Sequence, residues 1–243
     1  MTATLTPPPA KAAPRVVQVA RMHSVAWPLA VGAPAAILFV AFAIGWVLFF
    51  AIPNPDSRTQ FTGGVTSVFF FGIGFYVQAM TQTFPFALGL SVTRREFFTA
   101  TALAGLVQSV VFGTVIYLLS LLETATSGWG VHMRMFGILD YVTTSPVTRL
   151  FALIALFFLV SSIGLLIGTM YLRWKLIGLM TLSAAAVVVI GGAVVLILWR
   201  QWWFTVGDAI ADTPRFVTMV VLPAVLAAVS LLGGWAVLRR TTP

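Results

Sequence analysis

Few side chains in this 243-residue sequence could carry out catalysis or bind a metal ion. There is no cysteine, which excludes disulfides, thiol chemistry and thiolate metal ligands. The two histidines, His23 and His132, lie near the ends of different apolar runs, so we interpret each as an interfacial side chain rather than a metal ligand. No serine or threonine has both a histidine and an acid placed to activate it. We therefore expect no enzymatic activity from this chain.

The chain also lacks the usual sequence motif for binding nucleotide phosphates. A phosphate-binding loop ends in Gly-Lys-Ser/Thr, whereas the only lysines here are Lys11, which follows Ala10, and Lys175, which follows Trp174. We expect that the chain binds no cofactor itself and cannot hydrolyse ATP by that route on its own.

The polar groups inside the apolar runs are amides and hydroxyls. Gln78, Thr81 and Gln82 have i, i+3, i+4 spacing and share one helix face, and Gln108 and Ser109 lie in the next run. Amides are costly to bury in lipid, so they must face other helices or a wet cavity. Interhelical hydrogen bonds and a translocation pathway both explain them. No charged residue lies in the middle of a run, which argues against a proton-driven mechanism.

These residues belong to an integral membrane protein. Of all residues, 60% are hydrophobic and 8% charged, and the mean hydropathy is +1.02. Soluble domains have about 25% charged residues. The net charge of +8 does not indicate a nucleic-acid partner, because the basic residues are scattered between apolar runs instead of clustered on a solvated surface.

We predict an all-α fold with six transmembrane helices, because runs of about 20 apolar residues are long enough to cross a bilayer. A cytoplasmic leader, 1–25, precedes a single transmembrane domain, 26–240. The leader is either an amphipathic surface helix over about 13–25 or a disordered basic segment. The predicted spans are 26–52, 63–90, 97–122, 150–171, 176–199 and 216–238.

The distribution of Lys and Arg predicts the orientation, because cytoplasmic loops retain positive charge. With both termini in the cytoplasm, the inner segments contain more of these residues than the outer ones. The inner ones are Lys11, Arg15, Arg21, Arg94, Arg95, Arg173, Lys175, Arg239 and Arg240, and the outer ones are Arg58, Arg134, Arg149, Arg200 and Arg215.

Two outer segments are too long and too apolar to be simple turns. For 123–149 we predict an interfacial helix. The segment 200–215 reads RQWWFTVGDAIADTPR, and its tryptophans suit an interfacial belt. A re-entrant segment between the fifth and sixth spans explains the same residues equally well. Inside the fourth span, Gly164 and Gly168 form a GxxxG spacing that predicts close helix packing.

The chain resembles a known family over nearly its whole length, and the most specific part of the resemblance lies in two inner loops. Residues 84–98 read FPFALGLSVTRREFF and residues 171–179 read YLRWKLIGL. Together with six spans and cytoplasmic termini, they make the chain resemble the permease subunits of ATP-binding-cassette exporters of the ABC-type-two class. This resemblance implies a dimer with a second permease copy or a paralogue, in a bacterial plasma membrane. It also implies two separate ATPase subunits, which bind ATP and Mg on the cytoplasmic side.

The resemblance further implies a short coupling helix between the second and third spans, which docks onto the ATPase. The residues that it assigns to this contact are Ser91, Val92, Thr93, Arg94, Arg95, Glu96 and Phe97. It also places the re-entrant segment at about 202–211. From the residues alone, Arg94 and Arg95 are explained equally well as topology determinants.

We therefore expect the permease subunit of an ATP-driven exporter that moves an amphipathic small molecule, drug or lipid. A non-transport accessory or anchoring subunit of a membrane complex is the alternative. Membrane lipids are partners in either case.

Overall fold

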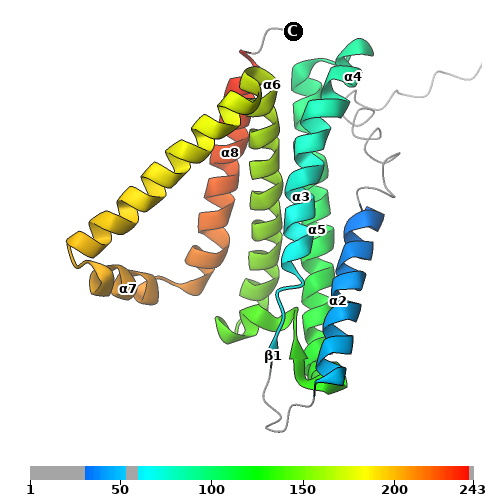
Figure 1. Ribbon diagram of the computed structural model, residues 1–243, viewed down its shortest axis with the longest axis vertical. Coiled ribbons are helices and arrows are strands. Elements are labelled where there is room, and N and C mark those ends of the chain that lie inside the picture. Colours follow the sequence, from blue (N-terminus) through cyan, green and yellow to red (C-terminus); the bar gives the residue numbers. More distant parts are fainter. Residues whose placement is uncertain (1–30, 53–59, 241–243) are drawn as a thin grey trace, which may run out of the picture.

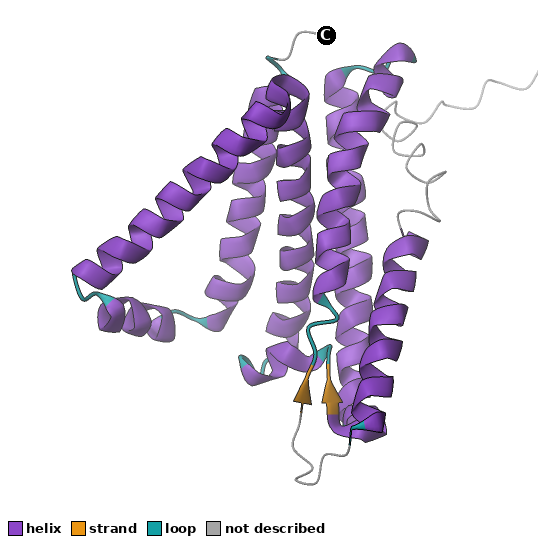
Figure 2. Ribbon diagram, in the orientation of Figure 1, coloured by secondary structure: helices purple, strands orange, loops and turns teal. Residues whose placement is uncertain are grey.

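The computed structural model describes residues 31–52 and 60–240. The leader and surface helix predicted within 1–25, and the first residues of the first predicted span, lie outside this part of the chain. The described residues are almost all helical, with two very short strands (Figure 2). Four helical stretches are long and apolar enough to cross a membrane: Ala33–Ala51, Arg94–Ala125, Pro146–Trp199 and Val217–Leu238. An all-α membrane protein is therefore the architecture, as predicted.

The helices run up and down the long axis (Figure 1). One end holds the loop before Arg94, the break at Lys175 and the last turn before Arg240, and we call it the basic end. The other end holds residues 126–145 and a short helix after Trp199, and we call it the capped end. The main helices are α2 (Ala33–Ala51), α3 (Thr66–Gln78), α5 (Arg94–Ala125), α6 (Pro146–Trp199) and α8 (Leu222–Leu238).

Helix α6 contains 54 residues but is not one straight rod. At Lys175 the backbone has φ 52° and ψ −143°, a combination that residues with a Cβ rarely adopt. There the chain reverses at the basic end, so that the part before Lys175 and the part after it run in opposite directions (Figure 1). Helix α6 begins at Pro146, where the hydroxyl of Ser145 accepts from the Thr148 amide at 3.3 Å.

The second predicted span consists of three helical pieces. Helix α3 continues into a π-helical turn, η2 (Ala79–Thr83), and then into α4 (Phe84–Gly89), which has Pro85 in its first turn. A π-turn inserts one extra residue into the helix and shifts the faces of the turns on either side. Because proline lacks an N–H, Pro85 suits a position just after such a break.

The predicted interfacial helix over 123–149 is wrong. Instead, α5 continues to Ala125, and the next residues form short turns, η3 (Gly128–His132) and η4 (Gly137–Tyr141), around strand β2 (Met133–Arg134). Strand β2 pairs in parallel with β1 (Gln60–Phe61). Ser127, Trp129 and His132 have positive φ, which a regular helix does not allow.

Close contact between α3 and α6 occurs at the predicted GxxxG pair. A Cβ on Gly164 would lie 2.9 Å from the carbonyl oxygen of Ile73, and a Cβ on Gly168 would lie 2.6 Å from the Cβ of Met80. Glycine is therefore required at both positions, which confirms the packing role predicted from the spacing. The core on either side of this contact is mainly aromatic and aliphatic, and includes Phe97 near the basic end.

Among the residues that the structure describes, few pack against the part of α6 after residue 180. Nearly every residue from 180 to 199 is exposed, although the segment is apolar all round. After it, α7 (Trp203–Asp212) lies at the side of the bundle, between the lower ends of the second part of α6 and of α8 (Figure 1), with no buried residue. Helix α7 is amphipathic, with Val206 and Ile210 opposite Asp208 and Asp212. A short helix is therefore present where the sequence suggests a belt or a re-entrant segment.

Candidate functional site

The polar residues predicted to line a pathway separate into two groups. Gln78 and Gln82 lie on the exposed face of α3 and η2, where the Gln78 side-chain NH₂ donates to the Gln82 carbonyl oxygen at 3.1 Å. Thr81 is half-buried, and its hydroxyl donates to the Val77 carbonyl at 2.9 Å. This back-bonding satisfies the hydroxyl inside its own helix. The shared face predicted from the spacing is therefore present for the two glutamines.

Gln108 and Ser109 belong to the interior of the bundle. The Tyr76 hydroxyl donates to the Gln108 side-chain oxygen at 2.5 Å and so joins α3 to α5. The hydroxyl of Ser109, which is 1% exposed, donates to the Gly105 carbonyl at 2.6 Å. No contact within one chain joins these two residues to Gln78 and Gln82. The Gln108 contact matches the interhelical alternative, whereas the Ser109 hydroxyl bonds within its own helix.

A small cavity adjoins this interior group. Its volume is about 10 Å³, and its lining includes Gln108, Ser109 and Ser161 next to Pro34 of α2. A volume near one probe sphere with several polar groups suits a single water molecule. The cavity is too small for an amphipathic substrate, so it does not form a pathway within one chain.

The hydrogen bond of Tyr76 gives the first testable prediction. We expect Tyr76→Phe to lower the free energy of unfolding by about 1 kcal/mol, because interhelical hydrogen bonds in membranes contribute about 0.6–1.7 kcal/mol. The measurement is a denaturant titration in mixed micelles. Tyr141→Phe is the matched control, because Tyr141 is 61% exposed. Equal effects of the two variants would contradict the assignment.

The residues predicted to form a coupling helix do not form a separate helix. Residues 90–93 make a turn after α4, in which Ser91 has φ 60°, and α5 begins at Arg94. Thr93 is the N-cap: its hydroxyl accepts from the Glu96 amide at 3.2 Å, and the Glu96 carboxylate accepts from the Thr93 amide at 3.0 Å. This reciprocal pair is a capping box, which explains why an acid follows the two arginines.

The structure buries one of the predicted docking residues. Phe97 is 1% exposed, and its ring centroid lies 5.3 Å from that of Phe84 in the core, with the two rings tilted by 58°, so its side chain does not face the outside of this chain. Val92 is half-buried and packs against the same cluster. By contrast, Ser91 and Arg95 are exposed at the basic end, and Arg94 is partly exposed. Thr93 is exposed as well and Glu96 is partly exposed, so five of the seven predicted residues are open to a contact.

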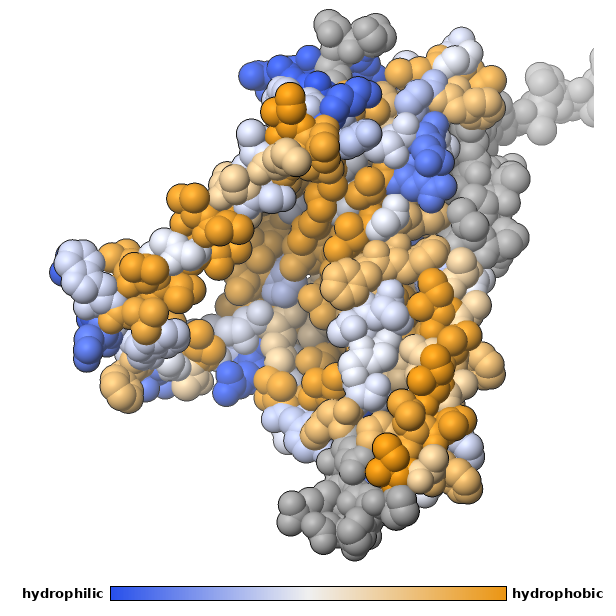
Figure 3. Space-filling model, in the orientation of Figure 1, coloured by the Kyte–Doolittle hydropathy of each residue, from blue (hydrophilic) through white to orange (hydrophobic). Residues whose placement is uncertain are grey.

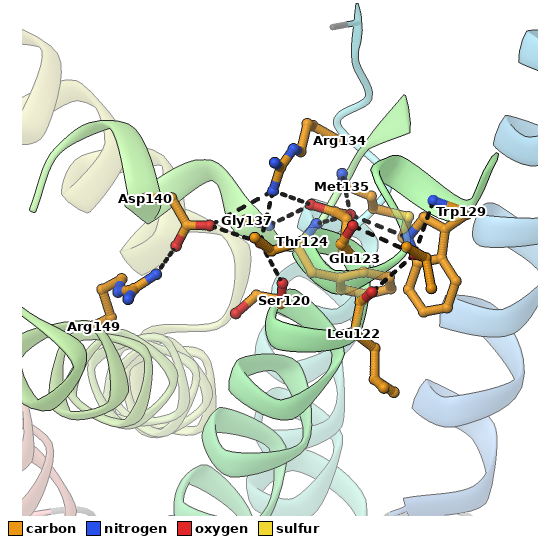
Figure 4. A network of polar contacts seen from close by, with 12 residues as sticks. Ser120, Leu122, Glu123, Thr124, Trp129, Arg134, Met135, Gly137, Asp140 and Arg149 are labelled. Atoms are coloured by element: carbon orange, nitrogen blue, oxygen red, sulfur yellow. Dashed lines mark hydrogen bonds and ion pairs between the residues drawn. The ribbon is translucent and has the colours of Figure 1, made fainter. Parts of the chain in front are cut away.

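A polar network at the capped end was missed by the sequence reasoning (Figure 4). Glu123, in the last turn of α5, has no exposed surface. Its carboxylate accepts from the amides of Met135, Phe136 and Gly137 at 2.8, 3.0 and 2.9 Å. It also accepts from the Trp129 indole N–H at 3.3 Å. These donors wrap the chain between α5 and α6 around one buried carboxylate.

Two arginines extend this network outward. The Arg134 guanidinium lies 3.8 Å from the Glu123 carboxylate and 3.6 Å from that of Asp140, and it donates to the Thr124 hydroxyl at 2.9 Å. Asp140 in turn contacts Arg149 in the first turn of α6 (Figure 4). Two carboxylates and two guanidiniums therefore alternate from the end of α5 to the start of α6, which makes the network a structural clasp.

The clasp consists of linked ion pairs and hydrogen bonds. In the parts of the chain that the structure describes, no group of three or more His, Cys, Asp or Glu side chains is close enough to hold a metal ion. The only sequence signal for the clasp is an acid at the end of an apolar run. Its main partners are backbone amides, which have no residue-type signature.

Comparison of the chain with models of known protein families, with curated proteins and with solved structures found no match.

Proposed function

We propose that the chain is the permease subunit of an ATP-driven exporter, with two permease copies and two separate ATPase subunits in the complex. The observation that carries this proposal is the exposed pair Gln78 and Gln82 on an otherwise apolar surface. Their mutual hydrogen bond uses one donor and one acceptor, while each amide group can make several hydrogen bonds. In hydrocarbon, each amide donor or acceptor that lacks a hydrogen-bond partner would cost several kcal/mol. A water-filled path or a polar substrate beside the two glutamines is therefore favoured.

The proposed topology has six passes with both termini at the basic end. The pieces α3, η2 and α4 have 13, 5 and 6 residues, and at 1.5 Å per residue they extend about 36 Å, enough for one pass. The reversal at Lys175 divides α6 into two further passes. With α2, α5 and Val217–Leu238, these make six.

The charges favour a cytoplasmic basic end. Among the described residues, the basic end has six cations and one acid, Glu96. The capped end has Arg134, Arg149, Arg200 and Arg215 and an equal number of acids. The rule that positive charge is retained inside therefore supports this orientation. Since the ATPase of such exporters is cytoplasmic, it would meet the basic end.

A second permease copy is supported by the exposed part of α6 around Gly191 and Gly192, residues 183–196. A Cβ added to Gly191 or Gly192 would meet nothing within 4 Å, although paired glycines in membrane helices usually serve close helix approach. A second copy placed on this surface would supply the missing helix partner.

The experiment tests the ATPase contact with two charge-reversed variants. The full chain is purified with the ATPase encoded beside its gene, and ATP hydrolysis and complex mass are measured. We expect Arg94→Glu with Arg95→Glu to reduce ATPase retention at least tenfold, because both cations lie at the exposed start of α5. The mass of the unaltered complex should correspond to two chains of each kind.

Arg239→Glu with Arg240→Glu is the matched control, with the same charge change at the same end but directly after α8. It should retain the ATPase. If both double variants retain it, or both lose it equally, the specific contact is refuted. If no ATPase is retained by the unaltered chain, the accessory-subunit alternative replaces the exporter.

A further inference from the structure

A groove lies beside the reversal of α6 at the basic end. Its volume is about 290 Å³, and it is lined by Met170, Trp174, Ile177, Gly178 and Thr181. The lining is almost entirely apolar, since the Thr181 hydroxyl donates to the Gly178 carbonyl at 3.0 Å within its own helix. Ile177 is 74% exposed, so the groove opens to the outside of the bundle.

Two cations lie next to lining residues of this groove along the chain: Arg173 precedes Trp174, and Lys175 lies two residues before Ile177. The Arg173 guanidinium lies 4.7 Å from the ring centroid of Trp174, which is itself part of the groove wall. The Lys175 ammonium lies 5.7 Å from the ring of Tyr171. Neither cation has a carboxylate within ion-pair distance among residues 31–52 and 60–240. Figure 3 shows hydrophilic side chains over the upper ends of α6 and α8, with hydrophobic ones directly below them along α6.

The backbone holds this arrangement in place. Lys175 occupies a strained conformation, with φ 52° and ψ −143°, and it is the residue at which the helix direction reverses. A reversal of this kind sets the two cations at the end of the apolar run instead of along its side. Tyr171 and Trp174 beside them have the amphipathic rings that favour the headgroup level of a membrane.

We propose that this groove is a binding site for one anionic phospholipid. The phosphate lies between Arg173 and Lys175, and one acyl chain lies along Met170, Ile177 and Thr181. Charge complementarity favours this occupant, because two cations without an acidic partner adjoin an apolar groove at headgroup level. The proposal depends on the membrane location of the chain and does not depend on transport or on an ATPase.

A phospholipid is favoured over a free phosphate, because a small anion would leave the apolar lining of the groove without a contact. A lipid occupies both parts of the site at once, so each part should contribute to affinity. The two parts can be removed separately, which makes the proposal testable with variants of the full-length chain.

The test measures lipid binding by native mass spectrometry, with dioleoyl phosphatidylglycerol and dioleoyl phosphatidylcholine as probes. We expect Arg173→Gln with Lys175→Gln to weaken phosphatidylglycerol binding on the order of 30-fold, because each cation near a headgroup contributes about fivefold. Binding of phosphatidylcholine should change little. Arg94→Gln with Arg95→Gln, which removes the same charge from the same end, should change phosphatidylglycerol binding less than about threefold.

A second variant tests the groove while leaving both cations. Thr181→Phe places a ring in the groove and should weaken phosphatidylglycerol binding about tenfold, without changing the binding of glycerol 3-phosphate. If glycerol 3-phosphate binds as tightly as phosphatidylglycerol, the site is one for small phosphates and the lipid proposal fails. If both arginine-containing double variants weaken binding equally, the attraction is a diffuse surface charge and the proposal also fails.

Discussion

Replacing Glu123 with glutamine is expected to lower the free energy of unfolding by about 3 kcal/mol. The carboxylate accepts hydrogen bonds from three backbone amides at 2.8–3.0 Å and has no exposed surface. A glutamine side chain has one acceptor oxygen, and its NH₂ group would face one of these amides. The substitution therefore leaves a buried donor without an acceptor and Arg134 without its buried counter-charge. The measurement is a denaturant titration of the chain in mixed micelles, with hydrogen exchange at residues 135–137 as a local readout.

Two further variants separate the roles within this clasp. Arg134→Gln should cost about 1 kcal/mol, because the guanidinium is partly exposed and the Glu123 carboxylate keeps its backbone donors. Asp208→Asn on α7 is the control and should change the free energy by less than about 0.5 kcal/mol. A cost for Glu123→Gln no larger than that for Asp208→Asn would show that the carboxylate is not a structural centre of the capped end.

The second large effect is expected where α3 contacts α6. We expect the double variant Gly164→Ala with Gly168→Ala to cost about 3 kcal/mol. An added methyl group at Gly164 would lie 2.9 Å from the Ile73 carbonyl oxygen, and one at Gly168 would lie 2.6 Å from the Met80 Cβ. Backbone atoms cannot turn aside as a flexible side-chain end can, so the two helices must separate and lose close packing. The midpoint of thermal unfolding in detergent measures this loss.

Gly233→Ala in α8 is the matched control for this prediction. Its added methyl group would have its nearest neighbour at 3.5 Å, which is an ordinary contact. The control should leave the unfolding midpoint unchanged within about 1 °C or raise it, because alanine favours helix over glycine. Stability of the double variant equal to that of the control would mean that α3 and α6 do not pack at this glycine pair.

The pathway and coupling predictions illustrate two limits of reading function from spacing. Helical spacing correctly placed Gln78 and Gln82 on one exposed face, because that relation depends only on local geometry. The same reasoning could not separate Gln108 from them, since its hydrogen bond with Tyr76 joins residues from two helices. Likewise, Phe97 reads as an apolar residue in a charged loop, but it is the fourth residue of α5 and points into the core.

The sequence alone determined the membrane class, the helical architecture and the close contact at Gly164 and Gly168, because apolar run length and residue size act locally. Only the tertiary structure decided the reversal at Lys175 and the clasp around Glu123. The physical reason is the nature of the partners. A buried carboxylate held by backbone amides depends on how the chain folds back after α5, and backbone amides are the same at every residue except proline.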